Sequence, residues 1–193
     1  MKIIIAGSGE VGSHLAKLLS YESQEITLID FNDEKLTFPN SQLDIKVIEG
    51  DCTSVSTLNK ANTNTADLFI GVTASEAINL MSCYIANQLG AKKTIARISN
   101  PELKENKDID FSRLGISELI SPEILTSKEI NMVINRAEFT DPFEFDDGAL
   151  ITLGLSATHT STFVGKTVVE AAEIFPETHF FPISIKREDK TII

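Results

Sequence analysis

A glycine-rich segment near the N-terminus has the residue types and spacing of a phosphate-binding loop. The pattern GxGxxG is formed by six consecutive residues, Gly7, Ser8, Gly9, Glu10, Val11 and Gly12. When such a loop follows a strand and opens a helix, its glycines allow a tight turn, a close approach of the backbone to a pyrophosphate, and close packing of the helix on the strand. The N–H groups at the start of the helix then face the phosphates. The segment therefore predicts a diphosphate site.

An acidic residue stands where a dinucleotide-binding fold expects one. Asp30 ends the second apolar segment, 18 residues after Gly12, and a carboxylate at this place accepts hydrogen bonds from the hydroxyls of the adenosine ribose. The same carboxylate would repel a 2′-phosphate, and Phe31 and Asn32 offer no compensating positive charge. The sequence favours NAD(H), or an adenine nucleotide such as ATP or ADP, over NADP(H).

Three further positions follow later apolar segments and are candidates for ligand contact. Asp51 follows the third segment, Thr73 and Ala74 follow the fourth, and Arg97 lies within the fifth. Ligands of open α/β sheets bind at the carboxyl ends of the strands, although the first two positions also suit a helix cap or a turn. An arginine in an apolar strand needs a partner, which we expect to be a phosphate, a carboxylate such as Asp51 or Glu76, or both.

The sequence offers no set of residues for catalysis or metal binding. Nucleophile, zinc-protease and Walker patterns are absent, so we assign no catalytic residue and no metal site. The acidic residues between 138 and 147 miss the spacing of a calcium-binding loop. Cys52 and Cys83 are 31 positions apart without a CxxC pattern, and we expect both to be free thiols.

The elements that must position these residues follow from the alternation of β-branched and helical segments, which predicts an α/β fold: a Rossmann-like, doubly wound parallel sheet. Strands are predicted at 2–6, 24–29, 45–49, 68–72, 94–98 and 118–120. Helices are predicted after the glycine loop and at 54–61, 75–89 and 122–137. Two apolar stripes are expected to face the sheet: Val11, Leu15, Leu18 and Leu19 in the first helix, and Ile78, Met81, Ile85, Ala86 and Leu89 in the 75–89 helix. Pro39 is expected to shorten or break any helix of the second crossover.

The composition changes after residue 137, which predicts a second, smaller part. We expect a nucleotide-binding domain at 1–137, a linker at 138–147 and the start of a small α+β domain at 148–193. The last part should contain a strand at 149–153, a helix at 167–174, and a strand pair at 181–186 and 191–193. Because the chain ends inside a predicted strand, we expect a piece of a longer protein, or a sheet that another subunit completes.

Composition and charge narrow the class of protein. The 193 residues are 42% hydrophobic, and 17 Lys and Arg stand against 28 Asp and Glu, a net charge of -11. This balance predicts a folded chain that does not bind nucleic acid through bulk charge. No apolar run has the length of a secretory signal or a membrane span, so we expect an intracellular location.

With these residues in place, the chain resembles the RCK/KTN family of cytosolic nucleotide-binding regulators of potassium transport. The resemblance rests on the glycine loop with Asp30 and on later blocks: Gly50-Asp51-Cys52-Thr53, Ala66-Asp67, Val72-Thr73 with Asn79 downstream, Ile95-Ala96-Arg97-Ile98, Ile120-Ser121-Pro122-Glu123, and Phe163-Val164-Gly165-Lys166-Thr167-Val168. It implies that this chain is a first half, cut before its second domain is complete. It also implies NAD contacts at Gly7 through Val11, Asp30, Thr73, Ala74 and Arg97. In relatives that prefer ATP, an arginine occupies the position of Glu10. The glutamate in this chain therefore favours NAD(H).

The resemblance implies regulation in place of catalysis. The expected partners are other copies of the chain, in a dimer or tetramer, and an integral-membrane potassium transporter, with the protein at the cytoplasmic face of the membrane. An apolar surplus at Ile130, Met132, Val133 and Ile134 fits a helix that crosses to a second copy. The alternative is a small NAD-dependent oxidoreductase or a redox sensor, which would need a proton donor beside the nicotinamide.

Overall fold

The structure of the protein is a computed structural model that describes residues 1–106, 108–135, 140–145, 149–174, 183–187 and 190–192. The chain forms two compact units, Met1–Glu129 and Ile130–Ile193. The division between them falls inside one helix, α6 (Pro122–Asn135). The predicted domain limits at 137 and 148 stay a prediction. In the described part of the chain, no helix combines the length and the apolar character that a membrane crossing requires.

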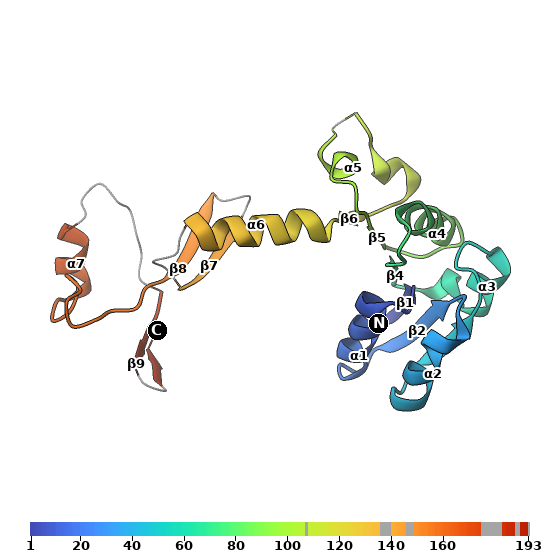
Figure 1. Ribbon diagram of the computed structural model, residues 1–193, viewed down its shortest axis with the longest axis horizontal. Coiled ribbons are helices and arrows are strands. Elements are labelled where there is room, and N and C mark those ends of the chain that lie inside the picture. Colours follow the sequence, from blue (N-terminus) through green and yellow to red (C-terminus); the bar gives the residue numbers. More distant parts are fainter. Residues whose placement is uncertain (107, 136–139, 146–148, 175–182, 188–189, 193) are drawn as a thin grey trace. The chain divides into compact units, whose positions relative to one another are not determined.

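The first unit is built on a six-stranded parallel sheet with the strand order β3-β2-β1-β4-β5-β6 (Figure 1). The chain runs out from β1 to one edge and then returns past β1 to the other edge, which confirms the predicted doubly wound, Rossmann-like sheet. The six strands match the predicted segments closely: β1 (Lys2–Ala6), β2 (Glu25–Asp30), β3 (Lys46–Glu49), β4 (Leu68–Gly71), β5 (Thr94–Arg97) and β6 (Glu118–Ile120).

Helices cover both faces of this sheet because its strands are apolar on both sides. One face packs against α1 (Glu10–Ser20) and α2 (Asp33–Gln42), and the other against α3 (Val55–Lys60) and α4 (Glu76–Gln88). Along β1, Ile3 and Ile5 enter the first layer and Ile4 enters the second, as the two-residue period of a strand requires. The short helix α5 (Glu102–Glu105) precedes β6.

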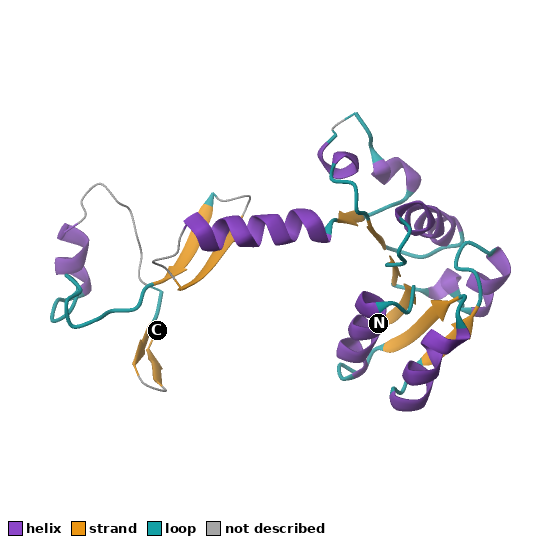
Figure 2. Ribbon diagram, in the orientation of Figure 1, coloured by secondary structure: helices purple, strands orange, loops and turns teal. Residues whose placement is uncertain are grey.

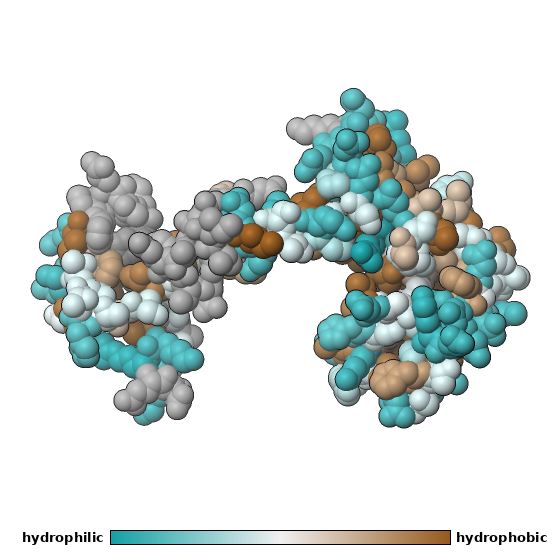
Figure 3. All heavy atoms as spheres, in the orientation of Figure 1, coloured by the Kyte–Doolittle hydropathy of each residue, from teal (hydrophilic) through white to brown (hydrophobic). Residues whose placement is uncertain are grey.

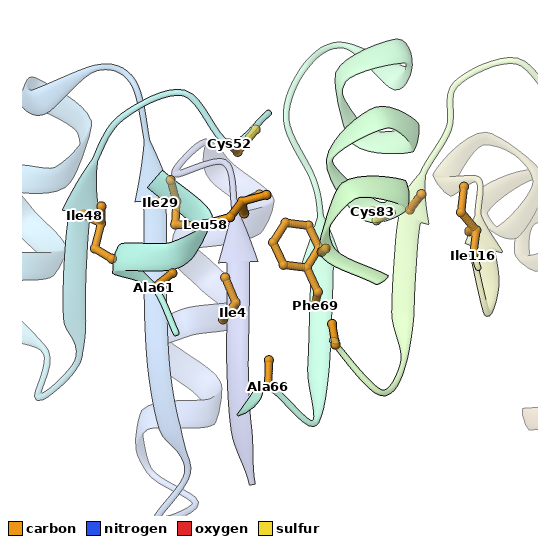
Figure 4. Packing of buried hydrophobic residues seen from close by; sticks show 14 residues of the cluster. Ile4, Ile29, Ile48, Cys52, Leu58, Ala61, Ala66, Phe69, Cys83 and Ile116 are labelled. Atoms are coloured by element: carbon orange, nitrogen blue, oxygen red, sulfur yellow. The ribbon is translucent and has the colours of Figure 1, made fainter. Parts of the chain in front are cut away.

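The layer on the α3 and α4 side contains Phe69 of β4, which is the largest fully buried side chain among the described residues. Figure 4 shows its ring between Leu58 of α3 and Cys83 of α4. Burying a side chain of this size contributes about 1.5–3 kcal/mol relative to leaving it exposed. This packing fixes α4 against the sheet, and α4 carries residues of the candidate site.

The predicted apolar stripes of α1 and α4 are in part wrong. In α1, Val11 and Leu18 are 44% and 52% exposed, whereas Gly12 and Ala16 are buried against the sheet. In α4, Ile78 and Met81 are exposed, and the buried face consists of Asn79, Ser82, Cys83 and Ala86. Small residues let a helix approach the strands closely, and hydrogen bonds replace apolar contact at Asn79, so the packed face does not follow hydropathy alone. Apolar side chains consequently reach the surface of this unit (Figure 3).

The expectation for Pro39 is also wrong, because α2 runs from Asp33 through Pro39 to Gln42. Asn32 caps the helix, since its side-chain oxygen accepts a hydrogen bond from the N–H of Glu34 at 3.0 Å. Proline has no N–H to bond the carbonyl four residues earlier, and that carbonyl belongs to Lys35. Its hydrogen bond comes from the glycine loop, as described below.

The described residues of the second unit form the end of α6, two small antiparallel sheets and one further helix (Figure 2). Strand β7 (Thr140–Phe145) pairs with β8 (Leu150–Gly154), and β9 (Ile185–Arg187) pairs with β10 (Lys190–Ile192). The helix α7 (Val168–Ile174) agrees with the predicted 167–174 segment. Residues 140–145, which were predicted to belong to the linker, form the strand β7. Residues 181 and 182 of a predicted strand lie outside the described residues.

Candidate functional site

The glycine loop crosses the carboxyl ends of the central strands. The N–H of Gly7 donates to the carbonyl of Ile29 at the end of β2, with a distance of 2.8 Å. On its other side, a Cβ atom at Gly7 would lie 2.8 Å from the nitrogen of Thr73, and the φ angle of Gly7 is +110°. Only glycine fits this position. The loop thus lies between β2 and β4, where the strand order reverses and α/β sheets bind ligands.

The other two glycines of the loop differ in their surroundings. A Cβ atom at Gly12 would overlap the carbonyl oxygen of Gly7, so this glycine is required for α1 to pack on the loop. At Gly9, no heavy atom lies within 4 Å of where a Cβ would be, and the backbone φ of -76° suits any residue. The packing of this chain does not require a glycine at position 9. The open space in front of the first turn of α1 fits the backbone approach of a diphosphate.

Asp30 lies directly beside this loop. Its side chain is only 7% exposed, and its carboxylate accepts hydrogen bonds from the N–H of Ser8 at 2.7 Å and from the N–H of Asn32 at 2.9 Å. The acid therefore joins the glycine loop to the start of α2. A carboxylate offers about four lone-pair positions, so two remain for the hydroxyls of a ribose.

Ser8 joins the loop to α2 a second time. Its hydroxyl donates to the carbonyl oxygen of Lys35 at 3.0 Å, the acceptor that Pro39 leaves without a helical N–H. Ser8 is 4% exposed. The proline in α2 thus supplies an acceptor that helps to hold the glycine loop.

Asp51 also lies at the carboxyl ends of the strands, after β3, but its carboxylate is hydrogen-bonded to a residue close by in the sequence. It accepts hydrogen bonds from the N–H of Thr53 at 2.8 Å and from its hydroxyl at 2.7 Å. These bonds hold the pKa of the Asp51 carboxyl below its usual value. Asp51 is exposed, and its contact with a ligand stays a prediction.

A buried amide connects the ends of β4 and β5. Asn79 of α4 is 1% exposed, and its oxygen accepts hydrogen bonds from the N–H and the hydroxyl of Thr73, each at 2.7 Å. Its nitrogen donates to the carbonyl oxygens of Thr73 at 3.1 Å and of Arg97 at 2.8 Å. Two predicted contact residues on neighbouring strands are thereby held by one side chain, whereas the third, Ala74, is exposed.

Arg97 has no carboxylate partner among the described residues. The expected ion pair with Asp51 or Glu76 is therefore not formed. The expected carboxylates are used elsewhere: that of Asp51 binds Thr53, and that of Glu76 accepts the N–H groups of Ser99 and Asn100 at 3.0 Å each. The Nε atom of Arg97 is buried without a hydrogen-bond partner. A buried unpaired donor is costly, and a phosphate oxygen would satisfy it.

The two cysteines are free, as expected, and both are buried. Burial raises the pKa of the Cys52 thiol to about 11 and that of the Cys83 thiol to about 12. Thiols with raised pKa values are poor nucleophiles at neutral pH. The Cys52 thiol, next to Asp51 in the sequence, is therefore not a nucleophile of the candidate site.

The sequence predicts ligand contacts at Gly7 through Gly12, Asp30, Thr73 and Arg97. In the structure the glycine loop, Asp30 and Thr73 lie at the carboxyl ends of the strands, and Arg97 is the last residue of β5. The role of Asn79 in this arrangement was not predicted. A usable signal was present: Asn79, Cys83 and Ala86 follow one another at helical spacing, which places a polar residue on the buried stripe of α4. A buried amide must be hydrogen-bonded, so this position already indicated a polar contact with the sheet.

Comparisons with known proteins identify the family of the chain. The model of the TrkA-N domain family matches residues 3–122. The chain is 31% identical over 193 residues to a Trk system potassium uptake protein TrkA homolog of Methanothermobacter thermautotrophicus, covering all of this chain and 86% of that protein. It is 34% identical over 195 residues to the Trk system potassium uptake protein TrkA of Haemophilus influenzae, covering 43% of that protein. The chain thus spans less than half the length of this second relative.

Solved structures share the fold. The GsuK channel bound to NAD aligns with 89% of this chain and 30% of its own, with a TM-score of 0.65 and 17% identity. The TrkA-N domain of the inner membrane protein ybaL from Escherichia coli aligns with 69% of this chain and 96% of its own, with a TM-score of 0.61 and 14% identity. GsuK has also been solved bound to ADP, and that structure aligns with a TM-score of 0.57 and 22% identity.

Proposed function

The chain belongs to the TrkA-N domain family, and on this premise we propose that it is a cytoplasmic NAD(H)-binding regulatory subunit of a membrane potassium-uptake transporter. Two relatives carry names that refer to potassium uptake. As such a subunit, the protein would act as a homo-oligomer at the inner face of the membrane, through contact with its transporter.

The observation that carries the ligand proposal is the open space at Gly9 beside the Asp30 carboxylate. The N–H groups of Gly9, Glu10 and Val11 would receive the pyrophosphate, because a helix N-terminus attracts anions. Asp30 would accept the ribose hydroxyls, and the Nε atom of Arg97 would find an acceptor. The exposed carboxylate of Glu10 disfavours the terminal phosphates of ATP by charge repulsion.

Regulation follows if the nucleotide shifts an equilibrium between two arrangements of the assembly. A ligand does so only by its difference in affinity for the two. A tenfold difference, about 1.4 kcal/mol, lies in the usual range of allosteric coupling. The proposal includes no turnover of substrate: the site is built from the glycine loop, Asp30, Thr73 and Arg97, and we assign none of these side chains a proton-transfer role.

The test is calorimetric titration of the protein with NADH, NAD+, ATP and ADP. We expect the wild type to bind NADH more tightly than ATP. Asp30→Ala should weaken NADH binding by about 1–3 kcal/mol, the cost of lost charge-assisted hydrogen bonds. Gly9→Ala should also weaken it, because the new methyl group enters the space of the pyrophosphate.

Gly12→Ala is the matched control for the glycine variant. Gly9→Ala should lower the unfolding temperature by no more than about 2–4 °C, since only helix capping is affected, at a cost of about 1 kcal/mol or less. Gly12→Ala should destabilise the fold by about 1–3 kcal/mol, because its methyl group meets the Gly7 carbonyl. Absence of NADH binding to the wild type, or equal affinity in Gly9→Ala, would contradict the proposed site. Consumption of NADH that depends on an added carbonyl substrate would support the oxidoreductase alternative.

A further inference from the structure

We propose that Asn79 is a positioning residue that makes this site favour a dinucleotide over an adenine mononucleotide. The inference rests on the proposed function, since it concerns the same site. Asn79 itself would not touch the ligand. It would act through Thr73 and Arg97, the two residues at the ends of β4 and β5 that its side chain holds together.

Asn79 has no free hydrogen-bonding capacity left for a ligand. Its oxygen accepts two hydrogen bonds from Thr73, and its nitrogen donates one to Thr73 and one to Arg97. An amide can make four such bonds in total, two as acceptor and two as donor, and Asn79 makes all four while only 1% exposed. Its contribution to binding must therefore be indirect.

The contacts of Asn79 fall on one side of the point where the strand order reverses. Dinucleotides lie across this point, with the adenosine half over the first strands, where the acid at the end of β2 takes the ribose. The loop on that side is held by Asp30 and by the carbonyl of Lys35. The side of β4 and β5 is held by Asn79, and it would receive the second half of a dinucleotide.

Glu76 also holds the part of the site at the ends of β4 and β5. It opens α4 three residues before Asn79, and its carboxylate accepts the N–H groups of Ser99 and Asn100, which begin two residues after the end of β5. Thr73, Arg97 and the segment after β5 are thus all tied to the first two turns of α4. A change at Asn79 should loosen the β4 and β5 ends while Asp30, Ser8 and the glycine loop keep their own hydrogen bonds.

The experiment compares NADH with AMP, because AMP lacks the second half of the dinucleotide. Dissociation constants are measured for the wild type, Asn79→Ala and Asn79→Asp. The aspartate keeps the shape of the side chain, but it replaces the NH2 group that donates to the two carbonyls by an oxygen that can only accept. We expect the affinity for NADH to fall about tenfold or more, and that for AMP to change less than twofold. Loss of a merely structural residue would weaken both ligands together.

Ser82→Ala is the control, because Ser82 is equally buried on α4 and its hydroxyl bonds the Asn79 carbonyl without reaching Thr73 or Arg97. It should leave the ratio of NADH to AMP affinity unchanged. If the Asn79 variants fail to fold, the side-chain amide resonances of Asn79 in the wild type decide: they should shift with NADH and stay in place with AMP.

A parallel loss of both affinities, or amide resonances that ignore NADH, would overturn the inference while the proposed function stands. Failure of the wild type to bind NADH would instead overturn the proposed function.

Discussion

Asp30 and Asn79 are buried polar side chains whose hydrogen bonds go mainly to the backbone of the surrounding loops. Asp30 holds two N–H groups, and Asn79 holds one N–H, one hydroxyl and two carbonyls. Such bonds form at folding, before any ligand arrives, so the loops need little further ordering on binding. Preorganisation of this kind raises affinity because it lowers the entropic cost of association.

Cys52 and Cys83 provide a prediction for alkaline pH. Both thiols have pKa values raised by burial, to about 11 and about 12, above the value of 9.0 of an unburied thiol. The stability that follows from this difference is fully present below pH 9 and is lost as the pH rises through the folded-state values, because the unfolded chain then releases thiol protons more readily. Each thiol should add up to about 1.4 kcal/mol per pH unit to this loss.

The measurement is urea unfolding, under reducing conditions, at several pH values between 8.5 and 10.5. Cys52→Ala/Cys83→Ala should show a smaller decline in the free energy of unfolding across this range than the wild type, although its stability at pH 8.5 is lower because the buried side chains are truncated. Lysines and tyrosines titrate in both proteins, so their share cancels in the comparison. Equal declines would show that the thiols are not held neutral by burial.

At the scale of elements, α2 and the glycine loop depend on each other through Ser8, Lys35 and Pro39. Ser8→Ala should destabilise the protein by about 1 kcal/mol, because the Lys35 carbonyl loses its hydrogen-bond donor. In a Pro39→Ala background, residue 39 regains an N–H that can reach the same carbonyl. The cost of Ser8→Ala should therefore be smaller there.

A double-mutant cycle, with stabilities from urea unfolding, measures this coupling. The two single variants, the double variant and the wild type are compared at neutral pH. A coupling of about 0.5 kcal/mol or more is expected between Ser8 and Pro39. Strictly additive costs would mean that the helix does not exchange its missing N–H for the Ser8 hydroxyl.

At this scale the pattern of apolar residues predicts the strands of the protein but not the packed faces of its helices. The six strands were predictable because buried parallel strands are continuous apolar runs. The sheet-facing sides of α1 and α4 were not, since Gly12, Ala16 and Asn79 pack by size and by hydrogen bonding. The continuation of α2 through Pro39 was not predictable, because the Lys35 carbonyl that the proline leaves without a helical N–H is bonded by Ser8, far away in the sequence. The positions of the glycine loop and of Asp30 at the carboxyl ends of the strands were predictable from their spacing, whereas the role of Asn79 was not. Their contacts with a ligand stay a prediction.

At the scale of the whole molecule, the proposal of a homo-oligomer predicts a mass in solution of at least twice the 21.1 kDa of one chain. On α6, Leu125 and Ile130 are 58% and 54% exposed, and apolar side chains of this size favour contact with a partner surface. The side chains of Met132, Val133 and Ile134, on which the expectation also rests, lie outside the described residues. Light scattering at micromolar concentration measures the mass.

Leu125→Asp/Ile130→Asp should lower that mass, because two charges would have to be buried in the interface. Leu18→Asp is the matched control, since Leu18 on α1 is similarly exposed, at 52%, and should leave the mass unchanged. A wild-type mass of a single chain would contradict the proposed assembly.

The two edges of the six-stranded sheet bear on how copies of the protein can meet. The edge strands β3 and β6 have four and three residues, and they begin or end with the charged residues Lys46, Glu49 and Glu118. Short, charged edge strands are poor templates for pairing with a strand of another chain. This sheet is therefore protected against growth into a continuous intermolecular sheet, and at high concentration the unit should resist amyloid-like aggregation even though apolar side chains reach its helical surface.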